Sequence, residues 1–385
     1  MWVNPGELRD ERLVEYVRNL TPKIKQLTLL PTELCNYRCK MCHVWGETGW
    51  ARKEPEKAIS EQLEITVLKR FIDEVLVENK NISVLLSGGE PLLYKHIVEL
   101  GQYLRSKKLT TYLLTNGTLI KENIDFILNN IIGLCLSIDG PEKYHDSIRQ
   151  EGSFQEICSN LEALMKEKKR LRKLFPYIQI NMTISQYNYA SVKDFVRELR
   201  ERFKEEKIIV YDSSTNPWAK KRDIAINFQP LYFTTKEKGM GYLAQMKELG
   251  CESASGWEGF LEDDPIDIDA ARLKRDLEDL WRAEGIDYSN FIDVYKYFTD
   301  INENFGKSKC IGPWHELTIR RTGDVYPCVD LPDYKIGNIY EASFKDIWEG
   351  NKLKKFREFL KKENLEMCNR CTRIWADPDA FNGLW

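Results

Sequence analysis

The sequence lacks the features of a membrane-spanning or exported chain. No run approaches the roughly 18 consecutive apolar residues that a spanning helix needs. The first segment, MWVNPGELRDERLVEYVRNL, is charged and contains no apolar core of a signal peptide. We therefore expect a cytoplasmic protein with no membrane partner.

An excess of charge of either sign is also absent. Lys and Arg (57) nearly balance Asp and Glu (60), which leaves a net charge of −3. This balance argues against a nucleic-acid partner, which ordinarily requires a broad basic field. Glycine (22) and proline (14) are too few in 385 residues for a disordered or collagen-like chain. The length suggests about two or three domains.

Cysteine, by contrast, is abundant, with ten residues. Thiols stay reduced in the cytosol, so disulfides are not the expected explanation. A cysteine without partners is most often a small buried packing residue. The spacing of the cysteines therefore decides which of them have a chemical role.

Residues 27–230 alternate between strand-like and helix-like patterns. Buried apolar strands separated by helices are typical of a parallel sheet. About six such units predict an α/β fold, either a partial (β/α)6 barrel or a doubly wound sheet, with ligand-binding residues after the carboxyl ends of the strands. The predicted strands are 27–33, 82–88, 110–115, 132–139 and 177–184, with 207–211 or 224–228 as the sixth, and Ser60 is predicted to cap a helix that runs through 78.

Three further segments flank this core. Residues 1–26 are predicted to be a charged helical lead-in, and residues 231–308 a mostly helical insert or linker. Residues 309–385 are predicted to form a small α+β domain. Within it, 315–328 has the pattern of a hairpin that turns at Gly323-Asp324, and 343–362 that of a helix with Ser343 as its N-cap.

Three cysteines lie in the loop directly after the first predicted strand. Cys35, Cys39 and Cys42 form a CxxxCxxC pattern. Three thiolates within eight residues can wrap one metal centre, and a [4Fe–4S] cluster held by three cysteines keeps one iron open for another ligand. Zinc sites usually have four protein ligands, often in CxxC pairs, so a zinc site or structural cysteines remain alternatives at this point.

The CxxxCxxC loop after the first strand of a partial (β/α) barrel resembles the radical S-adenosylmethionine (SAM) superfamily. Met41 fills the position before the third cysteine that is usually hydrophobic or aromatic there. In that family the open iron binds the amino and carboxylate groups of SAM. The resemblance implies a SAM-binding [4Fe–4S] cluster on Cys35, Cys39 and Cys42, and a partial (β/α)6 barrel.

Three more strand ends strengthen this resemblance. Gly88-Gly89-Glu90-Pro91 is similar to the family's GGEP motif, which holds the SAM amino group, and Thr115-Asn116 begins a TNG turn. Ser137-Ile138-Asp139-Gly140, followed by a segment that ends in Arg149, resembles the pattern of the sulfatase and peptide maturases, in which Ser and Arg contact SAM. The resemblance therefore implies SAM contacts for Gly88, Gly89, Glu90, Pro91, Thr115, Asn116, Ser137, Asp139 and Arg149. The alternatives are tight turns for the glycine motifs and Asp139, and a surface ion pair for Arg149.

A second cysteine set follows in 309–375. Cys310, Cys328, Cys368 and Cys371, with the sequence between them, resemble the auxiliary-cluster modules of radical SAM enzymes, the SPASM domain or the shorter twitch domain. Four cysteines rather than seven favour the twitch form with one auxiliary [4Fe–4S] cluster. A zinc ribbon is the competing interpretation. Cys135, Cys158 and Cys251 lack partners at metal spacing and are predicted to pack in the interior.

The resemblance implies an oxidoreductase, of the dehydrogenase kind, that reductively cleaves SAM to a 5′-deoxyadenosyl radical. The radical abstracts a substrate hydrogen, and an electron passes to the auxiliary cluster. An external donor such as flavodoxin or ferredoxin would supply the reducing electron. No spacing selects a general base among His315, Glu316 and Arg320.

The substrate class is less constrained by the sequence. Only 34 residues precede Cys35, which favours a small molecule such as a sugar, aminocyclitol or other alcohol over a peptide that needs its own recognition domain. A peptide or protein maturase is the alternative. A non-enzymatic electron carrier is a distant one, since it leaves the motifs at the strand ends unexplained.

Overall fold

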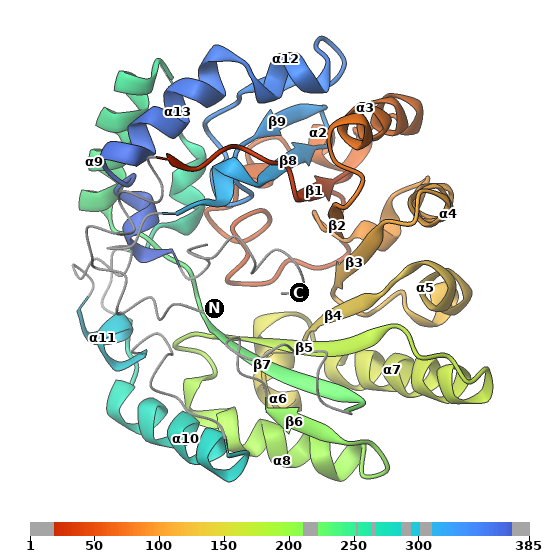
Figure 1. Ribbon diagram of the computed structural model, residues 1–385. Coiled ribbons are helices and arrows are strands. Elements are labelled where there is room, and N and C mark those ends of the chain that lie inside the picture. The colour runs from red at the N-terminus through yellow and green to blue at the C-terminus, as the bar shows by residue number, and fades with distance from the viewer. Residues whose placement is uncertain are drawn as a thin grey trace.

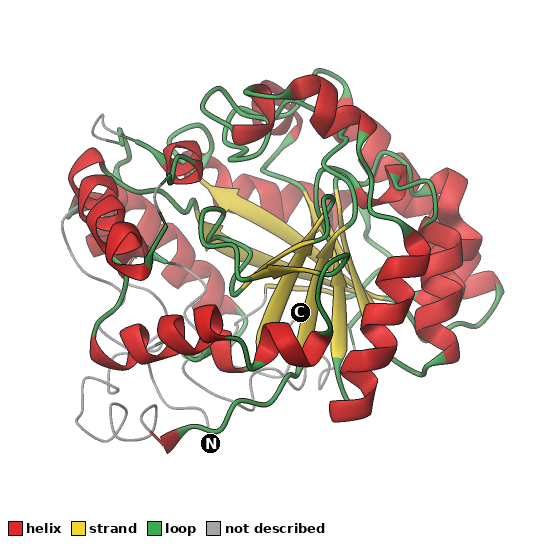
Figure 2. Cartoon of the chain, turned by 90° about the horizontal axis from the view of Figure 1, so that it is seen from above, coloured by secondary structure: helices red, strands yellow, loops and turns green. Residues whose placement is uncertain are grey.

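A single sheet forms the centre of the computed structural model, which describes residues 19–210, 222–251, 253–262, 266–285, 294–300 and 310–371 (Figure 1). The strands are β1 (Gln26–Leu30), β2 (Ser83–Leu86), β3 (Thr110–Thr115), β4 (Gly133–Ser137), β5 (Tyr177–Ile184), β6 (Ile208–Val210), β7 (Ile224–Pro230), β8 (Glu316–Arg320), β9 (Asp324–Tyr326) and β10 (Gly337–Asn338). They curve into an open arc, and helices ring the strands when the molecule is seen from above (Figure 2).

The helices lie mainly outside this arc (Figure 1). They are α2 (Pro55–Ser60), α3 (Ile65–Glu78), α4 (Ile97–Ser106), α5 (Ile124–Asn130), α6 (Glu142–Ile148), α7 (Ser153–Arg170), α8 (Val192–Arg202), α9 (Lys236–Leu249), α10 (Ala270–Ala283), α11 (Val294–Thr299), α12 (Phe344–Trp348) and α13 (Asn351–Lys362). No helix in the described part of the chain is both long enough and apolar enough to cross a membrane.

The strand order confirms the predicted partial barrel. The order is β10-β9-β8-β1-β2-β3-β4-β5-β7-β6, and every pair from β8 to β6 is parallel. Both candidates for the sixth strand are strands: β7 pairs with β5, and the three-residue β6 lies beyond β7 at the edge. Parallel strands place all their carboxyl ends at one edge, where the motifs of the sequence lie.

The hairpin predicted near the C-terminus extends the barrel sheet. β8 and β9 pair antiparallel, with Gly323 at a φ of 77° in the turn between them, as predicted. β8 also pairs in parallel with β1, from Gln26 opposite Glu316 to Leu30 opposite Arg320. The two cysteine-bearing segments of the sequence are therefore joined by a continuous sheet.

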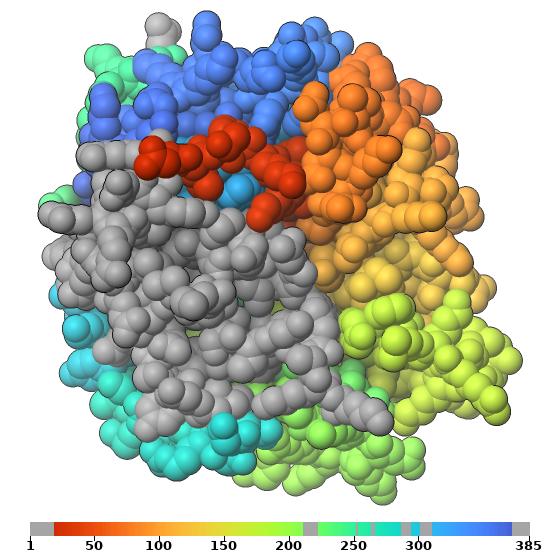
Figure 3. Space-filling model, in the orientation of Figure 1, coloured from red at the N-terminus to blue at the C-terminus, as the bar shows by residue number. Residues whose placement is uncertain are grey.

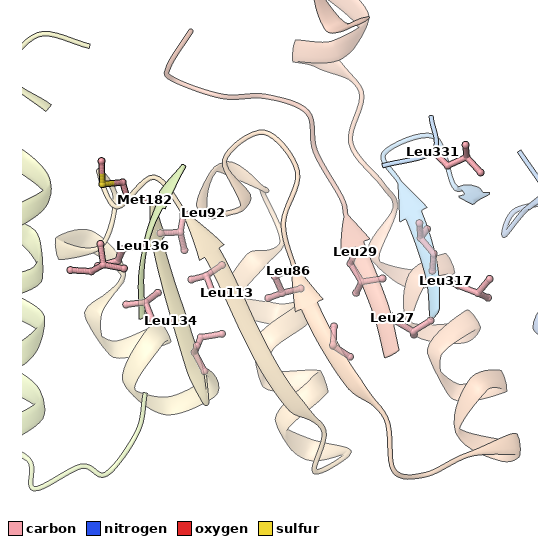
Figure 4. Packing of buried hydrophobic residues seen from close by; sticks show 14 of the residues in the cluster. Leu27, Leu29, Leu86, Leu92, Leu113, Leu134, Leu136, Met182, Leu317 and Leu331 are labelled. Carbon is pink, nitrogen blue, oxygen red and sulfur yellow. The ribbon is translucent and has the colours of Figure 1, made fainter. Parts of the chain in front are cut away.

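The side chains of the strands alternate between two environments. Leu27 and Leu29 of β1 pack with Leu317 of β8 in the core between the sheet and the helices (Figure 4). Residues that alternate with them, such as Thr28 and Glu316, point to the other face, where the Thr28 hydroxyl donates to the Glu316 carboxylate at 2.7 Å. The outer face is thus apolar, and this part of the inner face is polar.

Two predicted helices are divided in the structure. Ser60 ends α2 instead of capping α3, which starts at Ile65, because Gln62 between them forms a bridge to Thr32. The helix predicted over 343–362 is also two helices, since Gly350 adopts an extended conformation between α12 and α13. The predicted N-cap at Ser343 is confirmed, with a complete capping box.

The flanking segments are described only in part. Residues 1–18 of the predicted lead-in 1–26 lie outside the described residues. The residues that follow contact the segment that precedes β8, where the Lys23 amide donates a hydrogen bond to the Trp314 carbonyl. The described parts of 231–308 contain α9, α10 and α11. In the space-filling view, the C-terminal segment (blue) adjoins the orange segment that contains α2 and α3, and α12 contacts α3 (Figure 3).

A truncated core side chain on β8 should destabilise the whole described fold. We expect Leu317→Ala to lower the free energy of unfolding by about 2–5 kcal/mol, because it leaves a cavity in the core that β8 shares with β1. Val77→Ala, at a side chain that is 81% exposed, is the control. Denaturant unfolding should show one cooperative transition that moves to lower denaturant. A separate early transition for the C-terminal segment alone would contradict a shared core.

Candidate active site

The loop after β1 holds the first three cysteines. Cys35, Cys39 and Cys42 are each half-buried. The Tyr37 amide donates to Cys35 Sγ at 3.5 Å, and the Trp45 amide donates to Cys42 Sγ at 3.3 Å. Amide donors to sulfur stabilise thiolates and are one of the protein's means of tuning an iron–sulfur cluster. The loop therefore suits thiolates that are bound to a cationic centre.

Burial makes these thiols poor acids on their own. It raises the pKa of Cys35 to about 12, with a smaller opposing effect of the Tyr37 amide, and it raises the pKa of Cys39 above its usual value. Iron deprotonates a coordinating thiol and removes this cost. In the described residues, no group of three His, Cys, Asp or Glu side chains is arranged to hold a single metal ion. Three cysteines, two of them with amide donors to sulfur, are the type of donor set that iron–sulfur clusters use.

The glycines after β2 let that strand end approach the cysteine loop. The Gly89 amide donates to the Thr32 carbonyl at 3.0 Å, and the Glu90 amide donates to the Leu34 carbonyl at 2.7 Å. A Cβ on Gly88 would lie 2.4 Å from the Thr32 oxygen, and one on Gly89 would lie 2.3 Å from the Leu34 oxygen. Any side chain at these two positions would push the residues before Cys35 away.

Glu90 joins the ends of β2 and β3. Its carboxylate is fully buried and accepts hydrogen bonds from the Leu92 amide (3.1 Å), the Thr115 hydroxyl (2.8 Å) and the Asn116 amide (2.8 Å). Burial raises the pKa of Glu90 to about 7, and these donors oppose that shift. Pro91 starts the 3-10 turn Pro91–Leu93 that Glu90 caps. Glu90 therefore holds the edge of the site together, whether or not it also meets a ligand.

Asn116 connects β3 to the cysteine loop. Its side-chain amide donates to Asn36 Oδ1 at 2.8 Å and lies 4.0 Å from Cys35 Sγ, while the Thr118 hydroxyl donates to Asn116 Oδ1 at 2.7 Å. The Asn36 side chain donates in turn to the Thr118 hydroxyl at 2.9 Å. These polar contacts fix the first cysteine against the third strand.

Asp139 and Arg149 form a buried ion pair beneath the second cysteine. Arg149 Nε donates to Asp139 Oδ2 at 2.6 Å, and Nη1 lies 3.7 Å from Cys39 Sγ. The arginine side chain is only 11% exposed, so it is not a surface ion pair. Burial by itself lowers the pKa of Arg149, but Asp139 and Cys39 raise it above its usual value. A permanently charged guanidinium therefore lies beside the cysteine loop.

The rest of the motif around Asp139 holds this pair in place. The Thr183 amide donates to Asp139 Oδ1, and the Asn188 side chain donates to the Asp139 carbonyl. The Asp139 amide donates to His145 Nδ1 at 3.0 Å, and burial lowers the pKa of His145 to about 2, so this histidine is neutral. Ser137, at the end of β4, is half-buried and lies opposite Asn181 of β5.

The second cysteine set gathers around Tyr232, which follows β7. Burial raises the pKa of Tyr232 well above its usual value, and the nearby Cys371, Cys368 and Cys328 raise it further. Burial and then Cys371 and Cys310 likewise raise the pKa of Cys368. The Tyr232 hydroxyl donates to the Met367 carbonyl at 2.9 Å. The four cysteines that the sequence groups are therefore neighbours in the structure.

The remaining three cysteines differ in burial. Cys135 and Cys158 are buried in the interior, and Cys251 is half-buried, with its thiol on the Ser253 and Asp333 carbonyls. All ten cysteines fall within the described residues, and none of them forms a disulfide there.

One ion-pair network joins the two cysteine-bearing segments. Glu33, two residues before Cys35, accepts from Arg321 Nε at 2.6 Å and from Trp50 Nε1 at 3.3 Å. Arg321 follows β8 and also pairs with Glu61. Sequence patterns did not reveal Glu33 or Arg321, because the two residues are far apart in the chain and belong to no motif.

The three general-base candidates occupy different environments. His315 is buried, and its Nδ1 lies within hydrogen-bonding distance (2.9 Å) of the Lys23 carbonyl oxygen. Burial lowers the pKa of His315 to about 4. Glu316 lies at the amino end of β8, away from the cysteines, whereas Arg320 ends that strand beside Leu30 of β1. Of the three, only Arg320 lies at the edge where the motifs gather.

Two protein-family models match this chain. The Radical SAM superfamily model matches residues 29–199, and the SPASM model, an iron–sulfur cluster-binding domain, matches residues 310–372. The matched segments contain, respectively, the first cysteine set with its strand-end motifs and the second cysteine set.

Curated and solved proteins agree with these matches. The chain is 29% identical over 309 residues to the AdoMet-dependent heme synthase of Methanosarcina barkeri, which covers 79% of this chain and 78% of that protein. It is 25% identical over 355 residues to the cysteine-type anaerobic sulfatase-maturating enzyme of Clostridium perfringens, with 88% and 83% covered. The fold is similar, with a TM-score of 0.55 and 19% identity, to native anSMEcpe with bound AdoMet and Cp18Cys peptide, over 93% of this chain and 94% of that one. The chain therefore contains a Radical SAM domain and a SPASM domain, and these two domains imply SAM and two [4Fe–4S] clusters as its cofactors.

Proposed function

We propose that this protein is a radical SAM enzyme that modifies a peptide or protein substrate. The supporting observation is the likeness to a sulfatase-maturating enzyme over 88% of the chain, together with a fold shared with a structure that holds both AdoMet and a peptide. The small-molecule substrate expected from the sequence loses its support. It rested on the small number of residues before Cys35, which left no room for a separate peptide-recognition domain. However, the match covers 94% of the chain that was solved with a bound peptide.

The chain's own residues divide the work at the first site. Cys35, Cys39 and Cys42 would hold the cluster, which would supply the electron for the reductive cleavage of SAM. Arg149 is held at Nε by Asp139, so its outer nitrogen suits the SAM carboxylate in a charge-assisted hydrogen bond. Gly88 and Gly89 keep the cysteine loop against β2.

The second site is proposed to handle electrons and not to bind SAM. Four cysteine ligands complete a [4Fe–4S] cluster and leave no open iron. Cys310, Cys328, Cys368 and Cys371 would hold this auxiliary cluster, which suits a net oxidation of the substrate. The reducing electron for the first cluster would come from an external donor such as flavodoxin or ferredoxin.

A tetrapyrrole is the second candidate substrate. Its supporting observation is the 29% identity to an AdoMet-dependent heme synthase. The two candidates separate in an anaerobic assay of the reconstituted enzyme with SAM and a reductant, in which released 5′-deoxyadenosine is measured with sulfatase-derived peptides or with tetrapyrroles. Release that depends on a peptide, with a mass change in that peptide, supports the main proposal. Release that depends only on a tetrapyrrole overturns it.

Removal of the first cysteine set should abolish SAM cleavage. Replacing Cys35, Cys39 and Cys42 together by Ala should reduce the iron content from about eight to about four atoms per chain, because one of two four-iron clusters is lost. 5′-Deoxyadenosine should then fall to background. Cys251→Ser is the matched control, since its thiol bonds only to nearby carbonyls and should leave iron and turnover unchanged. Intact SAM cleavage in the triple variant would refute the assignment.

Loss of the charge on Asp139 should weaken SAM binding. Asp139→Asn leaves the Arg149 guanidinium without its charged partner, and we expect about tenfold weaker binding, the effect of losing the orientation of one charge-assisted hydrogen bond. Asp194→Asn, which breaks an exposed pair with Arg197, is the control and should change nothing. Calorimetric titration of the reconstituted protein with SAM measures both. Equal affinities in the two variants would show that the ion pair does not position the SAM contact.

A further inference from the structure

Arg320 is a buried arginine between the two cysteine-bearing loops. Arg320 is the last residue of β8 and lies opposite Leu30 of β1, which is five residues before Cys35. The residue as a whole is only 7% exposed. The guanidinium carbon lies 4.6 Å from the ring centroid of Trp50, in the loop that follows Cys42, and 4.8 Å from that of Tyr326, two residues before Cys328. It therefore occupies the site edge of the sheet, between the segments that carry the two clusters.

The charge of Arg320 is poorly compensated by the described residues. Its single hydrogen bond runs from Nη2 to the Val329 carbonyl at 3.4 Å, and its buried Nε has no partner among them. The nearby carboxylate of Glu33 is already engaged by Arg321 and Trp50. Arginine is rarely buried without a partner, because the desolvation of its charge is costly.

Two other buried arginines show how the fold ordinarily solves this problem. Arg357, stacked on Trp348, donates to the Pro313 and Trp348 carbonyls at 3.0 and 3.1 Å. Arg370, stacked on Phe233, donates to the Asp300 and Tyr297 carbonyls at 3.0 and 2.5 Å. Nη2 of Arg357 also lacks a partner among the described residues, so the difference lies in the acceptors. Arg357 and Arg370 each have two carbonyl acceptors, whereas Arg320 has one, at the limit of hydrogen bonding. Among the described residues, Arg320 therefore has capacity for a further hydrogen-bond acceptor.

We propose that Arg320 binds a carboxylate of the substrate. The rings of Trp50 and Tyr326 pack against the guanidinium, and a planar guanidinium with unused donors matches the two oxygens of a carboxylate. Its contacts are two aromatic rings and a carbonyl, whereas the arginine that approaches a cysteine sulfur is Arg149. The inference rests on the proposed function only in that the substrate is a peptide that reaches this edge of the sheet.

The carboxylate could belong to an acidic side chain or to the C-terminus of a peptide. The probes are therefore a pentapeptide with one glutamate and blocked ends, its glutamine counterpart, and a neutral pentapeptide with a free α-carboxylate. Anisotropy of labelled peptides measures their binding to the reconstituted, SAM-bound enzyme. We expect one of the two carboxylate probes to bind about tenfold or more tightly than its neutral counterpart, which is the strength of a hydrogen bond to a charged group.

Variants at Arg320 connect this preference to the residue. Arg320→Met keeps the length and the stacking but should abolish the preference, and Arg320→Lys should retain part of it. Arg357→Met is the matched control, because it removes an equally buried arginine in the same domain and should keep the preference. If neither carboxylate probe is preferred by the wild-type enzyme, or if Arg320→Met keeps the preference, the inference is wrong.

Thermal unfolding provides a second measurement that does not require a peptide. Arg320→Met should not lower the unfolding temperature, because it removes a buried charge with little compensation. Arg357→Met should lower it, because two buried carbonyls lose their donor. A large loss of stability in Arg320→Met would mean that Arg320 is structural. A preference that disappears with Arg320 while no peptide is modified would overturn the proposed function and not this inference.

Discussion

The close approach of the Gly88-Gly89 backbone to the residues before Cys35 is the contact on which the site depends. Two amide-to-carbonyl hydrogen bonds fix the distance, and the absence of both Cβ atoms permits it. The sequence motif would suggest that the glycines make room for a ligand. In the structure, the space beside the glycines is occupied by the backbone carbonyls of Thr32 and Leu34. The cysteine loop therefore takes its position from the end of β2.

From this contact, the site extends strand by strand. Glu90, after β2, accepts a hydrogen bond from the Asn116 amide at the end of β3. The Asn116 side chain in turn donates to Asn36, the residue after Cys35. Asp139 fixes Arg149 against Cys39 from β4. At the opposite edge, β8 pairs with β1, and Glu33 joins Arg321. Because Glu90 and Asp139 are fully buried and the other links connect them to the cysteine loop, movement of one strand end would disturb the geometry around the cysteines.

Much of the fold could be predicted because buried parallel strands are continuous apolar runs. The predicted strands 110–115 and 177–184 match the structure residue for residue. The motifs follow the ends of the strands, as predicted. The structure brings the polar side chains of the motifs to one edge of the sheet, but their partners within the protein could not be predicted from the sequence. The pairing of β8 with β1 and the Glu33–Arg321 pair escaped prediction, since nothing local encodes a contact between residues nearly 300 positions apart. The prediction that Ser60 caps a helix was wrong because serine also fits the last turn of a short helix. There its hydroxyl donates a hydrogen bond to the Glu56 carbonyl.

Central to the proposed function is a cluster on Cys35, Cys39 and Cys42 whose remaining iron binds SAM. Electron–nuclear double resonance of the one-electron-reduced protein, with SAM isotopically labelled at its amino nitrogen and carboxylate, tests that claim most directly. The account predicts hyperfine coupling of both labels to a cluster that is lost when the three cysteines are replaced. A reduced cluster without coupling to either label, at saturating SAM, would contradict it.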